Sequence, residues 1–240
     1  EFSPDIVLHL ASYSTSSDDE QSIRRLVDSN IVFVSMLLDA LRSSKVKLFI
    51  NTGSFSEYSS NDNSFNPAYF YAATKTASRS IVSYYKKILN MKCCTIVPYT
   101  IYGGESKTKK VFDFMLDSLE CIEPIQMTKG LQILDFIHIE DVVSFYVHLL
   151  KNIDLIENGQ TYHLGTGVGT EIKTVASMVG DLSGSKCNIN WGGRNYRDSD
   201  IMKSIAPVSI LEHDLNWSPS INLRKGIELC YYQRLSENKK

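Results

Sequence analysis

Tyr71 and Lys75 lie four positions apart in the segment Tyr-Ala-Ala-Thr-Lys. This spacing places two side chains on one face of a helix, one turn apart. A cation held near a phenol favours the phenolate and lowers the pKa of the tyrosine, so the phenol can exchange a proton with a substrate oxygen near neutral pH. The hydroxyl of Ser54, which follows an apolar run, could hold the same oxygen. These residue types therefore predict proton transfer to or from a substrate oxygen.

The Tyr-Lys spacing is weak evidence by itself. With 13 tyrosines and 17 lysines in 240 residues, about one such pair is expected by chance. The surrounding order is more informative, because an apolar run ends at the Ser54 turn, a polar loop follows, and a helix rich in small residues carries the pair. An apolar strand ending in His9-Leu10-Ala11-Ser12 precedes them. This order favours a catalytic interpretation.

The elements that must position these residues alternate between strands and helices. Strands that alternate with helices of this length predict right-handed βαβ crossovers, and therefore an α/β fold with a parallel sheet. The nearly continuous apolar character of the first strand suits burial on both faces of such a sheet. We expect strands at 5–11, 46–52, 93–98, 133–139 and 161–167, and helices at 20–41, 68–89, 111–121, 141–150, 171–182 and 224–235.

Composition narrows the class of protein. With 43% hydrophobic residues, the 240-residue chain can bury the core of one domain, or of one domain with a lobe. Its net charge of -2 gives no reason to expect a nucleic-acid or membrane partner. Without a signal peptide or a membrane-length apolar run, we expect a soluble, cytoplasmic protein. Five cysteines without CxxC spacing predict neither a disulfide framework nor a metal site.

Eight short motifs together resemble the extended short-chain dehydrogenase/reductase family, in the branch of epimerases, dehydratases and 4-ketoreductases that act on nucleotide sugars. Each motif is weak, but they follow the family order from one end of the chain to the other. They are PDIVLHLAS (4–12), Asn30, NTGSFSEY (51–58), YAATK (71–75), YTIYGG (99–104), LDFIHIEDVV (134–143), YHLGTGVG (162–169) and LNWSP (215–219).

The resemblance implies a Rossmann-like parallel sheet with flanking helices and a small C-terminal substrate-binding lobe. Residues 1–104 would form part of the cofactor and catalytic domain. Residues 105–240 would form mainly the lobe, with 131–165 returning strands and a helix to the sheet. The family's first strand and glycine-rich cofactor turn are not found here, so we expect the 240 residues to be part of a longer polypeptide, or the N-terminal portion to be disordered or removed. The strand at 5–11 would then lie at a sheet edge.

The resemblance also assigns roles to residues, with NAD or NADP as the cofactor. Asn30 would help to position the catalytic lysine; otherwise it is an exposed polar residue interrupting a helix. The catalytic residues would be Ser54, Tyr71 and Lys75. The cofactor would contact Leu10, Ala11, Ser12, Asn30, Thr52, Tyr71, Lys75 and Pro98. The substrate would contact Ser54, Thr100, Lys110 and Arg197.

Two cationic positions could bind the diphosphate of a nucleotide sugar. Arg197 fits the family arginine, because a guanidinium can contact two phosphate oxygens at once; the alternative is a surface salt bridge to Asp198 or Asp200. Lys110 closes the charged loop 105–110, which would contact phosphate or simply be a solvated surface.

The residues after Ser54 separate the family's reactions. The 4,6-dehydratases place an Asp-Glu pair there, whereas this chain has Phe55 and Ser56, which disfavours water elimination. No cysteine lies near Ser54, unlike in fucose-synthase-like enzymes. The chain most resembles 4-ketoreductases of the CDP-abequose synthase type, although Thr100 and Leu134 depart from their pattern. We expect reduction of a 4-keto-6-deoxyhexose on a nucleoside diphosphate, with CDP favoured, or alternatively 4-epimerisation.

Two further classes stay open. One is a non-catalytic nucleotide-sugar-binding relative, and the other is a structural dimerisation domain. The resemblance implies a homodimer through the helices at 20–41 and 68–89, whereas the alternative is that their apolar stripes only cover the sheet.

Overall fold

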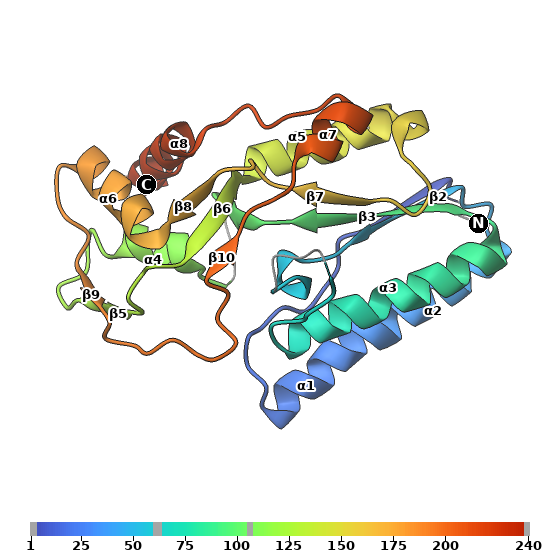
Figure 1. The fold of residues 1–240 in the computed structure, drawn as a ribbon, viewed down its shortest axis with the longest axis horizontal. Helices are drawn as coiled ribbons and strands as arrows, with labels where there is room; N and C mark the ends of the chain where they lie inside the picture. The colour runs from blue at the N-terminus through green and yellow to red at the C-terminus, as the bar shows by residue number, and fades with distance from the viewer. Residues whose placement is uncertain (1–3, 60–63, 105–107, 238–240) are drawn as a thin grey trace. The chain divides into compact units, whose positions relative to one another are not determined.

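The structure is a computed structural model that describes residues 4–59, 64–104 and 108–237 (Figure 1). The chain divides into two compact units. The first unit comprises Glu1–Pro98 and Asn152–His163, and the second comprises Tyr99–Lys151 and Leu164–Lys240.

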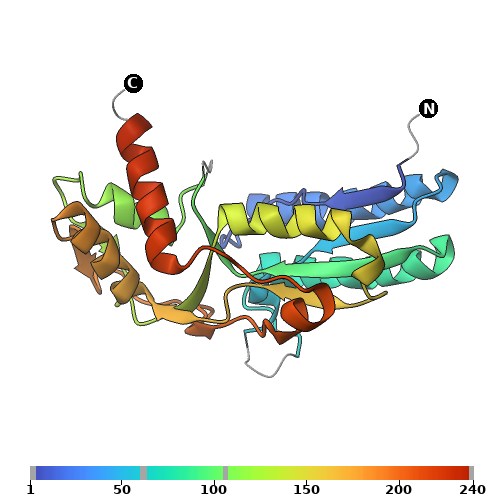
Figure 2. The same cartoon turned by 90° about the horizontal axis from the view of Figure 1, so that it is seen from above.

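A four-stranded sheet forms the centre of the first unit. Its strands lie in the order β1, β2, β3, β7, and the pairs β1–β2 and β2–β3 are parallel, as Figure 2 shows from above. The expected α/β fold with a parallel sheet is therefore confirmed. The strands are β1 (Ile6–His9), β2 (Leu48–Thr52), β3 (Lys92–Pro98) and β7 (Thr161–Leu164).

Strand β1 lies at the edge of this sheet, which corrects the expectation that it is buried on both faces. Strand β2 is almost entirely buried, but Ile6, Val7 and Leu8 of β1 are only half-buried because β1 has one neighbouring strand in this sheet. The strand also stops at His9 instead of residue 11, and residues 10–12 are exposed. The edge position itself is the one expected for this strand without the family's first strand beside it.

Three helices lie on one face of this sheet: α1 (Glu20–Val27), α2 (Phe33–Ala40) and α3 (Phe70–Leu89) (Figure 1). The expected continuous helix at 20–41 is wrong in one respect, because Asp28–Val32 forms a π-helical turn between α1 and α2. Such turns are often found at functional sites. Buried Asn30 lies in this turn.

Helix α3 carries the Tyr-Lys pair and is continuous over its 20 residues. It ends at Asn90, which adopts the left-handed conformation (φ 47°) common at helix C-termini. The apolar faces of α2 and α3 pack with strands β2 and β3 into one core. This core contains Val34, Leu38, Leu41, Val46, Phe49, Val82, Met91 and Cys93.

The second unit is built around strand β6 (Ile133–His138). Strand β6 pairs in parallel with β4 (Thr100–Tyr102) and β10 (Lys203–Ser204), and antiparallel with β8 (Gly169–Glu171). A separate parallel pair is formed by β5 (Ile125–Met127) and β9 (Ile189–Trp191). The helices are α4 (Val111–Asp117), α5 (Ile139–Lys151), α6 (Ile172–Ser183), α7 (Ser209–Leu215) and α8 (Leu223–Glu237).

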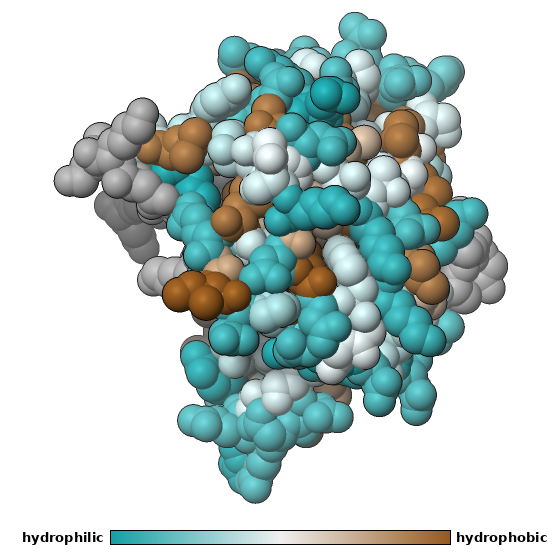
Figure 3. All heavy atoms as spheres, turned by 90° about the vertical axis from the view of Figure 1, so that its left-hand side faces the viewer, coloured by the Kyte–Doolittle hydropathy of each residue, from teal (hydrophilic) through white to brown (hydrophobic). Residues whose placement is uncertain are grey.

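The surface at the end of the second unit that carries α4, α6, β5 and β9 is mainly hydrophilic, with scattered apolar side chains (Figure 3). The core of the second unit is formed by residues such as Phe112, Phe136 and Val175. Within residues 4–59, 64–104 and 108–237, no helix has both the length and the apolar character needed to cross a bilayer.

Candidate active site

Helix α3 places Tyr71 in its first turn and Lys75 one turn later. The Lys75 side chain is buried (2% exposed), and this burial lowers the pKa of its ammonium to about 8. Burial also raises the pKa of Tyr71 to about 12, although hydrogen bonds with Ser12 and Ser54 act in the opposite direction.

The expectation that Lys75 makes Tyr71 more acidic is therefore wrong for this structure. The loss of solvent around the phenol outweighs its two hydrogen bonds, and the charge of Lys75 does not contribute to the shift. At pH 7 the Tyr71 phenol is neutral. A neutral phenol can donate a proton to a developing alkoxide.

Ser54 follows strand β2 and caps the short 3-10 helix Phe55–Glu57. Its hydroxyl is buried, lies 2.8 Å from the Ser56 hydroxyl, and hydrogen-bonds with Tyr71. The Ser54 backbone N–H donates to Oε1 of Glu57 at 2.7 Å. The structure thus brings together the hydroxyls of Ser54 and Tyr71, which come from two different elements.

Asn30 is buried (2% exposed), so the interpretation of it as an exposed polar residue is wrong. Its Oδ1 accepts from Ser12 Oγ and from the backbone N–H of Tyr13, both at 3.1 Å. Its Nδ2 donates to the Tyr13 carbonyl and to Thr74 Oγ1, both at 3.0 Å. Asn30 thus connects the segment after β1 to the residue that precedes Lys75, and it makes no hydrogen bond to Lys75 itself.

In the first unit, the residues expected to contact a dinucleotide lie at or just beyond the carboxyl ends of three strands. Leu10, Ala11 and Ser12 are exposed beyond the end of β1, while Thr52 and Pro98 are half-buried at the ends of β2 and β3. Ligands of open α/β sheets bind at these carboxyl ends.

The Lys75 ammonium gives a second indication. The Lys75 side chain is buried, and this burial lowers the pKa of its ammonium. A ribose hydroxyl could accept a hydrogen bond from this ammonium. The residues present therefore fit the nicotinamide-ribose end of NAD or NADP.

The sequence analysis missed Glu57 and Arg79. Glu57 is completely buried, and its carboxylate pairs with Arg79, with 2.6 Å between Nε and Oε2. The spacing of Arg79, four residues after Lys75, was a signal available in the sequence, but its acidic partner lies in a distant turn.

The second unit contains three of the residues expected to bind substrate, and they lie on different elements of it. Arg197 is exposed and lines a cavity of about 310 Å³ together with Gln126, Arg194 and Asp200. Its backbone N–H donates to Oδ2 of Asp200 at 3.0 Å. Thr100 begins β4 and is half-buried opposite Phe136.

Lys110 lies directly before α4, where its backbone N–H donates to Asp113 and its side chain is exposed. Lys109 of the same lysine run forms an ion pair with Asp117 at 2.6 Å. Residues 105–107 of the expected phosphate loop lie outside the described residues.

Comparison with known proteins agrees with this geometry. The NAD dependent epimerase/dehydratase family matches residues 1–165. The chain is 28% identical over 228 residues to CDP-abequose synthase of Salmonella typhimurium, covering 92% of this chain and 74% of the relative. It is 25% identical over 252 residues to UDP-glucose 4-epimerase of Mycolicibacterium smegmatis, covering 95% of this chain and 75% of that relative.

Among solved structures, UDP-glucuronic acid 4-epimerase from Bacillus cereus in complex with UDP-glucuronic acid and NAD has the same fold. The TM-score is 0.86 at 23% sequence identity, over 96% of this chain and 76% of that one. The family match covers more than half of the 240 residues and confirms the resemblance read from the motifs. The chain therefore belongs to the NAD-dependent epimerase/dehydratase family of extended short-chain dehydrogenase/reductase enzymes.

Proposed function

We propose that this enzyme reduces the 4-keto group of a 6-deoxyhexose linked to a nucleoside diphosphate, with a CDP-linked sugar favoured. The feature that carries the proposal is the Tyr71 phenol, which interacts with the Ser54 hydroxyl and whose pKa is raised by burial. Ketone reduction needs an acid that protonates the oxygen as the carbon receives hydride. The similarity to CDP-abequose synthase supports this substrate class.

The proposed catalytic residues of the first unit each have a defined role in this reaction. When bound, NAD(P)H would supply the hydride and leave as NAD(P)+. Tyr71 donates its proton to the sugar oxygen, so that the carbonyl becomes an alcohol. The Ser54 hydroxyl hydrogen-bonds the same oxygen, and Lys75 binds a ribose hydroxyl of the cofactor. The residues expected to hold the rest of the cofactor are Leu10, Ala11, Ser12, Asn30, Thr52 and Pro98.

The proposal is tested by incubating the protein with CDP-4-keto-6-deoxyglucose and following the oxidation of NADH or NADPH. We expect oxidation of one equivalent of cofactor per sugar and a product with a hydroxyl at C4. UDP- and dTDP-linked sugars, compared at the same concentration, identify the preferred base. Sugar that binds without cofactor oxidation would contradict the proposal and favour a non-catalytic relative.

A 4-epimerase is the second candidate, and the similarity to a UDP-glucose 4-epimerase favours it. An epimerase must first remove a proton from a sugar hydroxyl, which requires the phenolate form of Tyr71. The raised pKa of Tyr71 opposes that step. The two reactions are distinguished by stoichiometry, because an epimerase interconverts two sugars without net consumption of cofactor.

We further propose that Arg197 binds the diphosphate. Arg197→Gln should raise KM for the nucleotide sugar by about 10- to 100-fold, since hydrogen bonds to charged groups contribute about 1.5–3 kcal/mol, while kcat changes little. Arg197→Lys should recover only part of the affinity, because an ammonium cannot contact two oxygens in the same way. Arg224→Gln, an exposed position on α8, is the matched control. An unchanged KM in Arg197→Gln would exclude this role.

The expected homodimer is also a proposal. Helices α2 and α3 pack against each other, and the segment 28–40 together with α3 exposes the apolar side chains of Val32, Phe33, Met36, Tyr84 and Ile88. Exposed apolar groups of this kind are typical of association surfaces. We expect light scattering to give the mass of two chains, and Met36→Asp to give the mass of one. Ile122→Asp, at an exposed apolar residue of the second unit, should leave the mass unchanged. A single-chain mass for the unmodified protein would exclude the dimer.

A further inference from the structure

A buried ion pair joins the Ser54 turn to helix α3. The Glu57 side chain has no exposed surface, and the Arg79 side chain is 11% exposed. Arg79 contacts both carboxylate oxygens, with Nε 2.6 Å from Oε2 and Nη2 3.2 Å from Oε1. Burying two charges requires good geometry and complete hydrogen bonding, and replacing such a pair by apolar residues often stabilises a protein. Stability alone therefore does not explain why these two charges are buried here.

The same carboxylate fixes the backbone of Ser54. Oε1 of Glu57 accepts from the Ser54 backbone N–H at 2.7 Å and from Nη2 of Arg79. The turn is tightly packed around this contact: a Cβ added at Gly53 would lie 2.6 Å from Oε1 of Glu57 and 2.7 Å from Nη2 of Arg79. Only glycine lets the turn approach the ion pair this closely.

Arg79 belongs to the face of α3 that carries the proposed catalytic residues. Tyr71, Lys75 and Arg79 follow one another at intervals of four residues, so their side chains lie along one face of the helix. The chain of contacts runs from Ser54 through Glu57 to Arg79, and from there along one helix to Tyr71. This chain ties the turn that carries one hydroxyl to the helix that carries the other.

We propose that Glu57 and Arg79 form a positioning pair, which sets the placement of Ser54 against Tyr71 and balances the charge around Lys75. The inference rests on the proposed function, because it takes Ser54, Tyr71 and Lys75 as the reacting constellation. Neither residue of the pair touches the substrate.

The two charges of the pair act on the pKa of Lys75 in opposite directions. Burial makes the largest contribution to the lowered pKa of Lys75, the Arg79 charge lowers this pKa further, and the Glu57 charge raises it. The other titratable groups beside Lys75 are Tyr71 on the same helix and His9 at the end of β1, whose own pKa is lowered by burial and by the charge of Lys75. Loss of Glu57 should thus lower the pKa of Lys75, whereas loss of Arg79 should raise it.

The test compares Glu57→Gln, Arg79→Gln and the double variant Glu57→Gln/Arg79→Met. Nitrogen-15 NMR of the lysine side chains follows the titration of Lys75 without any substrate. We expect the pKa of Lys75 to fall in Glu57→Gln, to rise in Arg79→Gln, and to return toward the wild-type value in the double variant, which buries no unpaired charge. Glu20→Gln, which breaks the exposed ion pair with Arg24 on α1, should not move it.

Steady-state kinetics tests whether the pair sets the placement of Ser54 against Tyr71. We expect kcat to fall on the order of 10- to 100-fold in each single variant, with KM for the sugar nearly unchanged, because misplacing a reacting group mainly affects the chemical step. Shifts of the Lys75 pKa in the same direction in both single variants, or none, would overturn the inference, as would equal losses in kcat and in sugar binding. If the wild-type protein shows no ketoreduction but the opposite pKa shifts are found, the proposed function fails and the charge balance stands.

Discussion

Tyr71→Phe is expected to lower kcat for ketone reduction by about 10²- to 10⁴-fold, the usual contribution of a positioned general acid. The substitution removes only the hydroxyl, and with it the proton that the sugar oxygen must receive. The apolar part of the side chain keeps its packing at the start of α3. Stopped-flow measurement of NAD(P)H oxidation at saturating sugar gives the rate, and isothermal titration gives the affinity for the nucleotide sugar.

Tyr69→Phe is the matched control for this substitution. The rings of Tyr69 and Tyr71 are stacked with their centroids 6.0 Å apart, so both changes perturb the same region. Only loss of the Tyr71 hydroxyl should slow the chemical step, and sugar affinity should stay within a few-fold of the wild type in both variants. If Tyr71→Phe keeps most of its turnover, Tyr71 is not the proton donor.

Lys75→Met should abolish most of the activity and yet stabilise the folded protein at pH 7. The pKa of Lys75 falls from 10.5 to about 8 on folding because the charged ammonium is buried. A shift of this size corresponds to about 3 kcal/mol of lost stability at pH 7, at about 1.4 kcal/mol per unit. Met is similar in size and carries no charge, so it removes this penalty. Urea denaturation at pH 7 should show a gain of up to about 3 kcal/mol.

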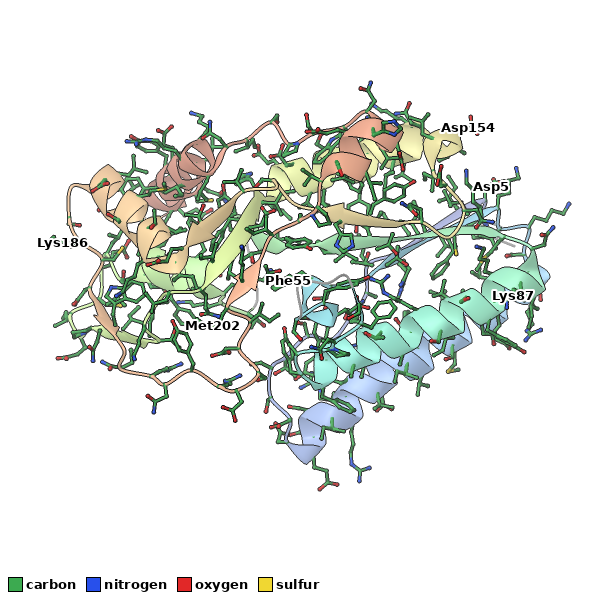
Figure 4. All side chains as sticks on the ribbon, in the orientation of Figure 1. Asp5, Phe55, Lys87, Asp154, Lys186 and Met202 are labelled. Carbon is green, nitrogen blue, oxygen red and sulfur yellow. The ribbon has the colours of Figure 1, made fainter. Side chains whose placement is uncertain are left out.

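The pH dependence gives a second readout of Lys75. Because the pKa is lower in the folded protein, the unfolded chain binds more protons between pH 8 and pH 10.5, and wild-type stability rises with pH across that window. In Lys75→Met this rise should disappear. Lys87→Met is the control, since Lys87 is exposed near the C-terminal end of α3, far from the Phe55 turn (Figure 4). A Lys75→Met protein that is less stable than the wild type at pH 7 would contradict a net cost of burying the Lys75 ammonium.

Local patterns were sufficient for the elements that carry the proposed catalytic residues. The apolar run before Ser54 predicts β2, which is buried on both faces, and the small-residue segment predicts α3, which is long enough to show a helical period. Strands β4, β8, β9 and β10 contain two or three residues each, too few for a period to be recognised.

The pKa of Tyr71 could not be predicted from spacing. Its neighbour in sequence, Lys75, suggested an acidic phenol, but the shift depends on how much water the folded structure removes from the ring. The same limit applies to Glu57, whose partner Arg79 is 22 positions away and meets it only in the folded chain. Asn30 was recognised as an interruption of its helix, but its hydrogen bonds to Tyr13 and Thr74 are tertiary contacts.

Transfer of a labelled hydride tests the account most directly. The wild-type protein and Tyr71→Phe are each mixed with CDP-4-keto-6-deoxyglucose and NAD(P)H that carries deuterium on the transferring nicotinamide carbon, and the sugar is then analysed by NMR. We predict that the wild-type product carries deuterium at C4 beside a new hydroxyl, and that Tyr71→Phe forms almost none of it. A wild-type product without deuterium at C4 would contradict hydride transfer to the ketone, and equal labelling by Tyr71→Phe would contradict proton donation by the Tyr71 phenol.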